Sequence, residues 1–512
     1  MSSIRTKKND SPLPRMFKPP EWHWHQAGVV GWWVTGSWDE ILLGSDGLRI
    51  EEWRREGRLT TIKSGPHRIV YRADLPAGGF YVKHYLVPNK RAILRQWFRR
   101  GKGRNEAKRS RQLEQIGVPT ITPVALGEHR IRKFLFENFL VTREITDTIP
   151  LDEFVEKHLP GYPASERRLV HRSLANQLAV MTARLHNEGL IHIDFHPGNL
   201  LVQFNQTGTP SLVMIDLDAL RKTRRLSWKN AGKNLALLDH FFWIRATTAE
   251  RYRFVKTYLK HRNEAHPDPR GFAGRIETST RRWAERLWRR WGERCRSTNK
   301  YFQVFEGNRT WGVASRDLDP SEMARLLEDP DWPFNEAGTR LLKDSSTTTV
   351  AETTMLVRGE PTQVILKRFN RKKWIDPLLT IFRPSRAWRS WQAGQHLVSR
   401  GIPTPQNLAF VLRRRSWRES PFFFLLPHET YLITVKQEDA ITLTDFARKH
   451  LPSLPPAEQR RVIGRIVLEL ASLIRTLHQR SLSDRDLKAS NILIDVSKLD
   501  TRVSLSLIDL VG

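Results

Sequence analysis

Residues 192–199 read His-Ile-Asp-Phe-His-Pro-Gly-Asn, and residues 484–491 read Asp-Arg-Asp-Leu-Lys-Ala-Ser-Asn. Each stretch places an aspartate five residues before an asparagine, after a helical run and before an apolar strand that ends in a second aspartate. The surrounding sequence also repeats, because residues 157–160 and 449–452 both read Lys-His-Leu-Pro. A repeat that runs through turns, helices and loops predicts two copies of one fold.

In the first copy the repeated polar residues are Asp194, Asn199 and Asp216. A carboxylate that orients an acceptor hydroxyl, an amide ligand and a distal carboxylate, in this order, are the parts with which protein kinases hold Mg-ATP. We therefore expect Asp194 to be the catalytic base, and Asn199 and Asp216 to bind Mg2+. The alternative is a turn with helix-capping acids, which the repeat disfavours.

A lysine and a glutamate upstream complete the expected ATP site. Lys83 lies in an aromatic stretch, residues 79–85, that is typical of a strand and gives a phosphate-binding lysine a rigid mount. Glu106 is the single acid in the basic helical stretch 90–111, and its position after the lysine strand predicts that it pairs with Lys83. Local charge neutralisation is the alternative for this glutamate.

The region before Lys83 lacks the glycine-rich lid of protein kinases, since residues 61–71 contain one glycine. Lys63 and Arg68, with His67, would then bind phosphates through their side chains. An ordinary basic hairpin is the alternative, and the sequence favours neither.

The second copy repeats the polar set as Asp486, Asn491 and Asp509, for which we expect the same catalytic and metal-binding roles. Lys367 matches the strand lysine of the first copy. Lys488 stands two residues after Asp486, where protein kinases carry a lysine. We expect both lysines to bind the nucleotide.

Two features distinguish the second copy from the first. The position that matches Glu106 is Ser390, with no acid nearby to pair with the lysine. The sequence also ends shortly after Asp509, whereas the first copy continues well beyond Asp216. We therefore expect the helical lobe of the second copy to be incomplete.

The combined pattern resembles the lipopolysaccharide kinase family, the Kdo and heptose kinases of Gram-negative bacteria. Asp-Leu-Asp at residues 216–218, where protein kinases have Asp-Phe-Gly, favours this family over true protein kinases. The resemblance implies an α+β fold of tandem protein-kinase-like domains, each with a β-rich N-lobe and a helical C-lobe. It also implies transfer of phosphate from Mg-ATP to a sugar hydroxyl of the lipopolysaccharide inner core. The stretches that carry the resemblance are 81–83, 105–107, 117–120, 192–199 and 214–218.

The pattern divides the chain into four parts. We expect a disordered basic tail at 1–20, a first kinase-like domain at 21–296, a linker at 297–334 and a second domain at 335–512.

The net charge of +31 favours anionic partners, such as a glycolipid, a phosphorylated sugar or a membrane surface. No stretch reaches the roughly 20 apolar residues of a membrane span, and the single Cys295 excludes an internal disulfide. With the resemblance, this composition indicates a cytoplasmic enzyme, peripheral on the inner membrane of a Gram-negative-type bacterium. No recognition signature for a specific nucleic acid is present.

A basic stretch near residue 290 has Trp283, Leu287 and Trp291 at helical spacing. Such a stripe fits either a helix on a membrane surface or one that packs on the first domain, and we favour packing.

Two other functions stay open. The protein could be a Ser/Thr protein kinase, although the glycine lid and the Ala-Pro-Glu segment are absent from the sequence. Alternatively, both copies could be pseudokinases that bind an anionic glycolipid or a protein partner without turnover.

Overall fold

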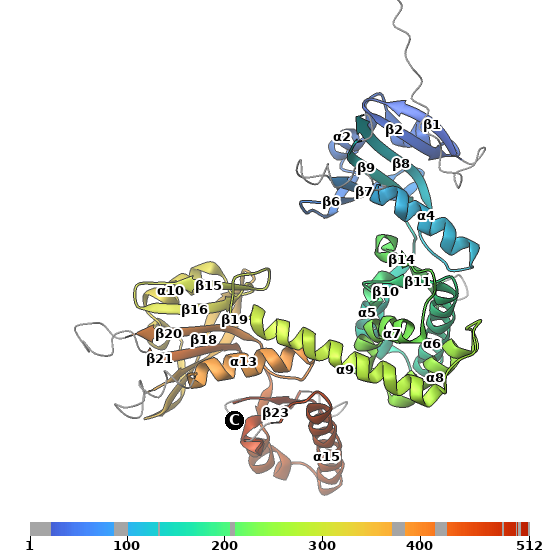
Figure 1. The fold of residues 1–512 in the computed structure, drawn as a ribbon. Coiled ribbons are helices and arrows are strands. Elements are labelled where there is room, and N and C mark those ends of the chain that lie inside the picture. The colour runs from blue at the N-terminus through green and yellow to red at the C-terminus, as the bar shows by residue number, and fades with distance from the viewer. Residues whose placement is uncertain are drawn as a thin grey trace, which may run out of the picture. The chain divides into compact units, whose positions relative to one another are not determined.

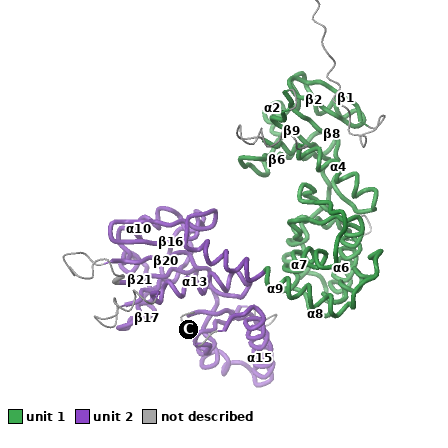
Figure 2. The backbone as a smooth tube through the Cα atoms, viewed as in Figure 1, with its two compact units in different colours: residues 1–283 green, residues 284–512 purple. Residues whose placement is uncertain are grey.

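The computed structural model describes residues 22–86, 101–131, 134–204, 210–370, 384–414, 427–483, 486–497, 499 and 503–509. The chain forms two compact units, residues 1–283 and 284–512 (Figure 2). The expected tail at 1–20 lies outside the described residues.

The N-lobe of the first unit is a seven-stranded antiparallel sheet (Figure 1). On the interior strand β7, Phe80 and Val82 are buried while Tyr81 and Lys83 are more exposed, which is the alternation of a strand with one face on the core. Helix α4 (Lys102–Gln115) packs against β7, β8 and β9. The strands, in spatial order, are β1 (Trp22–Ala27), β2 (Val30–Thr35), β8 (Pro123–Ile131), β9 (Phe134–Arg143), β7 (Gly78–Leu86), β6 (Arg68–Leu75) and β5 (Leu59–Lys63). The short helices α1 (Trp38–Leu42) and α2 (Ile50–Arg55) lie between β2 and β5 in sequence.

The C-lobe of the first unit is mostly helical. Its central helix α6 (Ala164–Asn187) ends because Gly189 takes a left-handed conformation, with φ of 65°, and Leu190 begins the next strand. The lobe also contains two small antiparallel sheets, one of β10, β12 and β13 and one of β11 and β14. The remaining elements are β10 (Thr148–Pro150), α5 (Leu151–Glu153), β11 (Leu190–His192), β12 (Leu200–Phe204), β13 (Pro210–Met214), β14 (Leu220–Lys222), α7 (Trp228–Trp243), α8 (Thr248–Lys260) and α9 (Pro269–Arg294).

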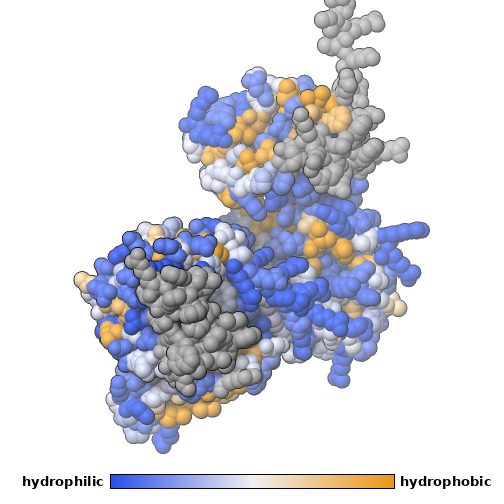
Figure 3. All heavy atoms as spheres, turned by 60° about the vertical axis from the view of Figure 1, so that its left-hand side comes forward, coloured by the Kyte–Doolittle hydropathy of each residue, from blue (hydrophilic) through white to orange (hydrophobic). Residues whose placement is uncertain are grey.

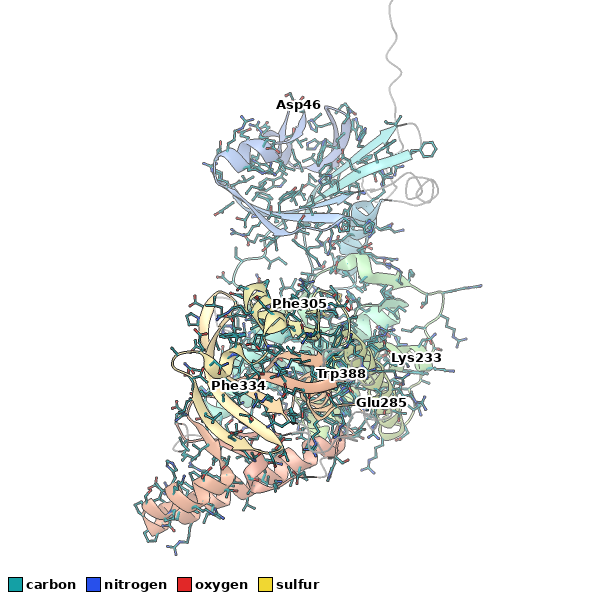
Figure 4. All side chains as sticks on the ribbon, turned by 90° about the vertical axis from the view of Figure 1, so that its left-hand side faces the viewer. Asp46, Lys233, Glu285, Phe305, Phe334 and Trp388 are labelled. Atoms are coloured by element: carbon teal, nitrogen blue, oxygen red, sulfur yellow. The ribbon has the colours of Figure 1, made fainter. Side chains whose placement is uncertain are left out.

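The second unit repeats the N-lobe sheet with the same strand order. The expectation of a linker at 297–334 is wrong, because these residues form the first two strands of this sheet and two helices. Figure 4 labels Phe305 and Phe334, which pack against one core cluster of the sheet, and Trp388, which packs against another. The elements are β15 (Phe302–Glu306), β16 (Thr310–Ser315), α10 (Pro320–Glu328), α11 (Trp332–Asn335), β17 (Arg340–Ser345), β18 (Thr348–Val357), β19 (Glu360–Phe369), α13 (Arg386–Ser399), β20 (Asn407–Arg414) and β21 (Pro427–Val435).

The described C-lobe of the second unit contains β22 (Ala440–Thr442), α14 (Leu443–Asp445), α15 (Pro456–Gln479), β23 (Ile492–Asp495) and β24 (Leu505–Leu507). Helix α15 matches α6, which packs against α8 in the first unit. On α15, Val467 and Leu468 are 58% and 73% exposed. The incomplete C-lobe stays a prediction.

Helix α9 contributes to the cores of both units. Phe272 and Ile276, in its first half, are buried in the first unit. Near its end, Arg400 lies over the Trp288 ring at 4.4 Å, and Trp291 packs against Phe302 with ring centroids 5.6 Å apart. The interpretation that the tryptophan stripe packs on the first domain is therefore wrong for Trp291, which packs in the second unit. Within the described ranges, no helix is long and apolar enough to cross a membrane.

A buried histidine in the first C-lobe is held in its neutral form. His186 Nε2 donates to Asn234 Oδ1 at 3.1 Å, and its Nδ1 accepts from the Tyr258 hydroxyl at 2.8 Å. Burial, with a smaller contribution from the charge of Arg262, lowers the pKa of His186 from 6.5 to about 4.

This histidine should make stability depend on pH. Between pH 6.5 and about 4 the unfolded chain binds a proton that folded His186 does not, so the unfolding free energy falls as the pH falls. The full effect is roughly 3 kcal/mol. Denaturant titrations of wild type and His186→Gln at several pH values measure it. The difference in unfolding free energy between the two proteins should change between pH 6.5 and about 4. A difference that stays constant with pH would contradict the lowered pKa of His186.

Candidate active site

The first unit joins a lysine, a tyrosine and a glutamate in one buried cluster. Lys83 and Tyr85 lie two residues apart on β7, so their side chains leave the same face of the sheet. Both donate to Glu106 of α4, the Lys83 ammonium to Oε1 and the Tyr85 hydroxyl to Oε2 at 2.6 Å. The Glu106 side chain is fully buried, so these two donors replace the water that its carboxylate loses. Burial and this carboxylate raise the pKa of Tyr85, which therefore keeps its proton.

Helix α4 approaches the sheet closely at Gly103, whose N–H donates to Asn138 Oδ1 at 2.9 Å. A Cβ at this position would lie 3.1 Å from the same oxygen, closer than ordinary packing allows. The helix also reaches the segment after Asp216, because Lys102 Nζ lies 3.7 Å from Asp218 Oδ2. The helix that carries Glu106 is therefore joined to both the sheet and the C-lobe.

The expected catalytic loop follows β11. Its shape is held by Asn199, whose Nδ2 donates to the backbone oxygen of Asp194 at 2.8 Å. The Asp194 side chain is 71% exposed, and His196 Nε2 lies 3.6 Å from its Oδ2. His192 at the start of the loop is buried, which lowers its pKa. The loop thus presents Asp194 to solvent, where a substrate hydroxyl can reach it.

Asp216 adopts a left-handed backbone conformation, with φ of 55°, which is uncommon for a residue other than glycine and concentrates at functional sites. Its Oδ1 lies 3.4 Å from Arg68 Nη1, so the predicted phosphate-binding arginine meets the predicted metal-binding carboxylate. The Asp216 carboxylate thus already faces one cation. Together with the amide oxygen of Asn199 it offers only oxygen donors, the ligand type that Mg2+ prefers.

The structure therefore groups most of the predicted residues of the first copy. Lys63 differs, because its side chain is exposed on the edge strand β5. β5 and β6 form a hairpin, which fits both interpretations of this region, so phosphate binding by Lys63 and Arg68 stays a prediction. Tyr85 was missed by the sequence analysis. Its spacing of two residues from Lys83 on a strand was the signal that could have identified it.

The second unit places its lysine differently. Lys367 Nζ donates to Asp509 Oδ1 at 2.7 Å, and Ser390 is the fifth residue of α13, as Glu106 is the fifth residue of α4. The other partners also change, because Thr348 and Phe369 lie opposite each other on β18 and β19. In the first unit the matching strand positions hold Arg68 and Tyr85. The positions of Glu106, Arg68 and Tyr85 are thus held in the second unit by Ser390, Thr348 and Phe369. Each replacement is smaller or apolar.

The catalytic loop of the second unit keeps its shape. Asn491 Nδ2 donates to the backbone oxygen of Asp486 at 3.0 Å, and Asp509 has φ of 56°. Lys488 Nζ donates to Asp486 Oδ2 at 2.8 Å, and this hydrogen bond lowers the pKa of Asp486. A cavity of about 920 Å³ is lined by Lys367, Asn491 and Asp509 among others.

Comparison with known proteins finds relatives among lipopolysaccharide core kinases. The chain is 24% identical to the lipopolysaccharide core heptose(I) kinase WaaP of Escherichia coli K12 over 29% of this chain and 56% of that protein. It is 29% identical to WaaP of Pseudomonas aeruginosa PAO1 over 31% of this chain and 59% of that protein. The chain thus spans a little over half the length of these curated relatives.

Solved structures also match at low similarity. The structure of WaaP in complex with acyl carrier protein has 21% identity and a TM-score of 0.37, over 49% of this chain and 98% of that chain. A rhoptry antigen kinase domain of Toxoplasma gondii has 15% identity and a TM-score of 0.27, over 43% and 83%. A model of the lipopolysaccharide kinase (Kdo/WaaP) family matches residues 72–258 and 335–511, which is most of the chain. The chain belongs to the lipopolysaccharide kinase (Kdo/WaaP) family, in two tandem copies.

Proposed function

We propose that the first unit transfers phosphate from ATP to a sugar hydroxyl of the lipopolysaccharide inner core. The observation that carries the proposal is the buried contact of Lys83 with Glu106, in the same unit as the exposed Asp194 and the strained Asp216. A heptose is the favoured acceptor over Kdo, because the curated relatives from Escherichia coli and Pseudomonas aeruginosa are heptose(I) kinases.

Each of these side chains has a separate role in the proposed reaction. Glu106 fixes the Lys83 ammonium, which then contacts the ATP phosphates as a positioned point charge. Asp194 orients the acceptor hydroxyl and accepts its proton as the bond to phosphorus forms. Asn199 and Asp216 would hold Mg2+, which would supply positive charge at the phosphate oxygens. Arg68, which faces Asp216 in this structure, would then be free to contact the phosphates, and we infer that it does so.

The second unit is better suited to binding than to turnover. Its lysine is held by Asp509, the carboxylate expected to bind metal, and the buried glutamate is replaced by Ser390. The hydrogen bond from Lys488 also makes Asp486 a weaker base by lowering its pKa. We infer that this cleft binds an anionic ligand without contributing most of the catalysis.

The charge of the chain supports a location next to an anionic surface. The net charge is +31, and the face seen in Figure 3 is largely hydrophilic. We infer peripheral attachment to the cytoplasmic face of the inner membrane, where basic side chains and anionic headgroups attract.

One prediction concerns the proposed base, Asp194. Asp194→Asn should lower the rate of phosphate transfer by about 10²- to 10⁴-fold, because the amide cannot accept the proton. Labelled γ-phosphate transfer from Mg-ATP to a lipopolysaccharide-core extract measures this rate. Asp486→Asn is the matched variant in the second copy and should keep most of the activity.

The same assay run with a protein extract tests the alternatives. Label that enters only protein would move the assignment to a Ser/Thr protein kinase. No transfer to either acceptor would favour the pseudokinase interpretation. Activity lost with Asp486→Asn but kept with Asp194→Asn would reverse the roles of the two units.

Another prediction concerns the buried glutamate, Glu106. Glu106→Gln removes the charge that fixes Lys83, so kcat/KM for ATP should fall by about tenfold or more, equivalent to at least about 1.4 kcal/mol. Ser390→Ala changes the same helical position in the second unit and should leave kcat/KM near the wild-type value. Steady-state kinetics and a thermal unfolding curve of each variant separate catalysis from folding. An unchanged kcat/KM in a folded Glu106→Gln protein would argue against the pair.

A further inference from the structure

Two histidines and an aspartate converge at the edge of the first N-lobe sheet. His23 and His25 lie two residues apart on the edge strand β1, so both rings leave the same face. His23 Nε2 lies 3.2 Å from Asp39 Oδ1, and His25 Nε2 lies 3.0 Å from Asp39 Oδ2. Asp39 belongs to α1, so the cluster joins this helix to the strand.

The geometry of the cluster matches that of a metal-ligand set. One ligand atom from each of the three residues can be chosen so that all lie within 4.8 Å of one another. Zn2+ binds imidazole nitrogens and carboxylate oxygens at about 2.0–2.2 Å, so ligands at tetrahedral angles stand about 3.3 Å apart. The two nitrogen–oxygen distances, 3.2 and 3.0 Å, each to a different oxygen of Asp39, are close to that separation. Because no two of the three ligand atoms are more than 4.8 Å apart, rotation of the side chains can bring all three to one ion.

The site is also accessible, because the side chains of His23 and His25 are each 38% exposed and that of Asp39 is 20% exposed. An ion can enter, and water can complete the coordination. Imidazole together with one carboxylate suits borderline divalent ions such as Zn2+, whereas Mg2+ prefers oxygen ligands alone.

The second unit shows that the fold does not require the histidines. Its strand β15 carries Gln303 and Phe305 at the matching positions, as the pairing of each strand with its neighbour shows. An aspartate, Asp319, follows the second strand at the same spacing as Asp39. The acid is therefore common to both units, and the histidine pair is particular to the first.

We propose that His23, His25 and Asp39 form a binding site for a divalent transition-metal ion of the Zn2+ type. Three strands separate β1 from β7, which carries Lys83, so the site is remote from the catalytic cluster. Its ion binds the folded protein and ties α1 to the edge strand, which stabilises the N-lobe by mass action. The proposal does not depend on the kinase activity.

The test uses the full-length chain, stripped of metal with a chelator and dialysed. Zn2+ is titrated by calorimetry into the wild type and into the double variant His23→Gln/His25→Phe, which installs the residues of the second unit. The wild type should bind one more equivalent of Zn2+ than the variant. Zn2+ should also raise the thermal midpoint of the wild type more than that of the variant, and Mg2+ should show no such difference.

Equal Zn2+ stoichiometry and equal thermal shifts in the two proteins would overturn the proposal and leave a histidine–aspartate ion pair only. A difference seen equally with Mg2+ would overturn the assignment to a transition metal. Circular dichroism of the metal-free proteins confirms that the variant is folded, and Asp39→Asn alone should weaken Zn2+ binding as a second, independent variant.

Discussion

The arrangement of the first unit depends on one buried carboxylate. Glu106 is fully buried, and its two oxygens are satisfied by Lys83 and Tyr85 from a single strand. A buried charge that loses its partner costs several kcal/mol, so the helix cannot easily leave the sheet. Because the same helix contacts Asp218 through Lys102, the position of Lys83 and that of the segment after Asp216 are set together. One satisfied charge thus couples the sheet, the helix and the C-lobe.

The second unit shows what remains of the fold when that charge is absent. Its sheet keeps the strand order of the first, although Ser390 replaces the glutamate. The strand order therefore does not require the ion pair. What changes is the direction of the lysine, because Lys367 donates to Asp509 across the cleft. The buried carboxylate governs where the lysine points, and the phosphate contact proposed for Lys83 depends on that direction.

Features that recur in the sequence, or that depend on a fixed spacing between residues, could be predicted from it. The two copies and the contact of Lys83 with Glu106 followed from repeated motifs and their order, and the bilobal fold followed from the resemblance to the lipopolysaccharide kinase family. The strands within 297–334 were missed, because short strands carry no motif and only weak periodicity. The stripe at Trp291 showed that a helix face would be buried, but periodicity does not identify the partner. The contact of Arg68 with Asp216 spans 148 residues, and only the folded chain brings them together.

Because helix α9 belongs to both units, it limits how one copy of the repeat could be exchanged between proteins during evolution. The core of the second unit includes Trp291 and Cys295, which precede its first strand at Phe302 and belong to or directly follow this helix. The boundary between the units falls within the helix, after Trp283. Exchange of one copy between proteins at a loop would therefore leave an aromatic core unfilled. The two copies share a structural element, so recombination must move part of a helix with its neighbour, and the pair is less modular than the sequence repeat indicates.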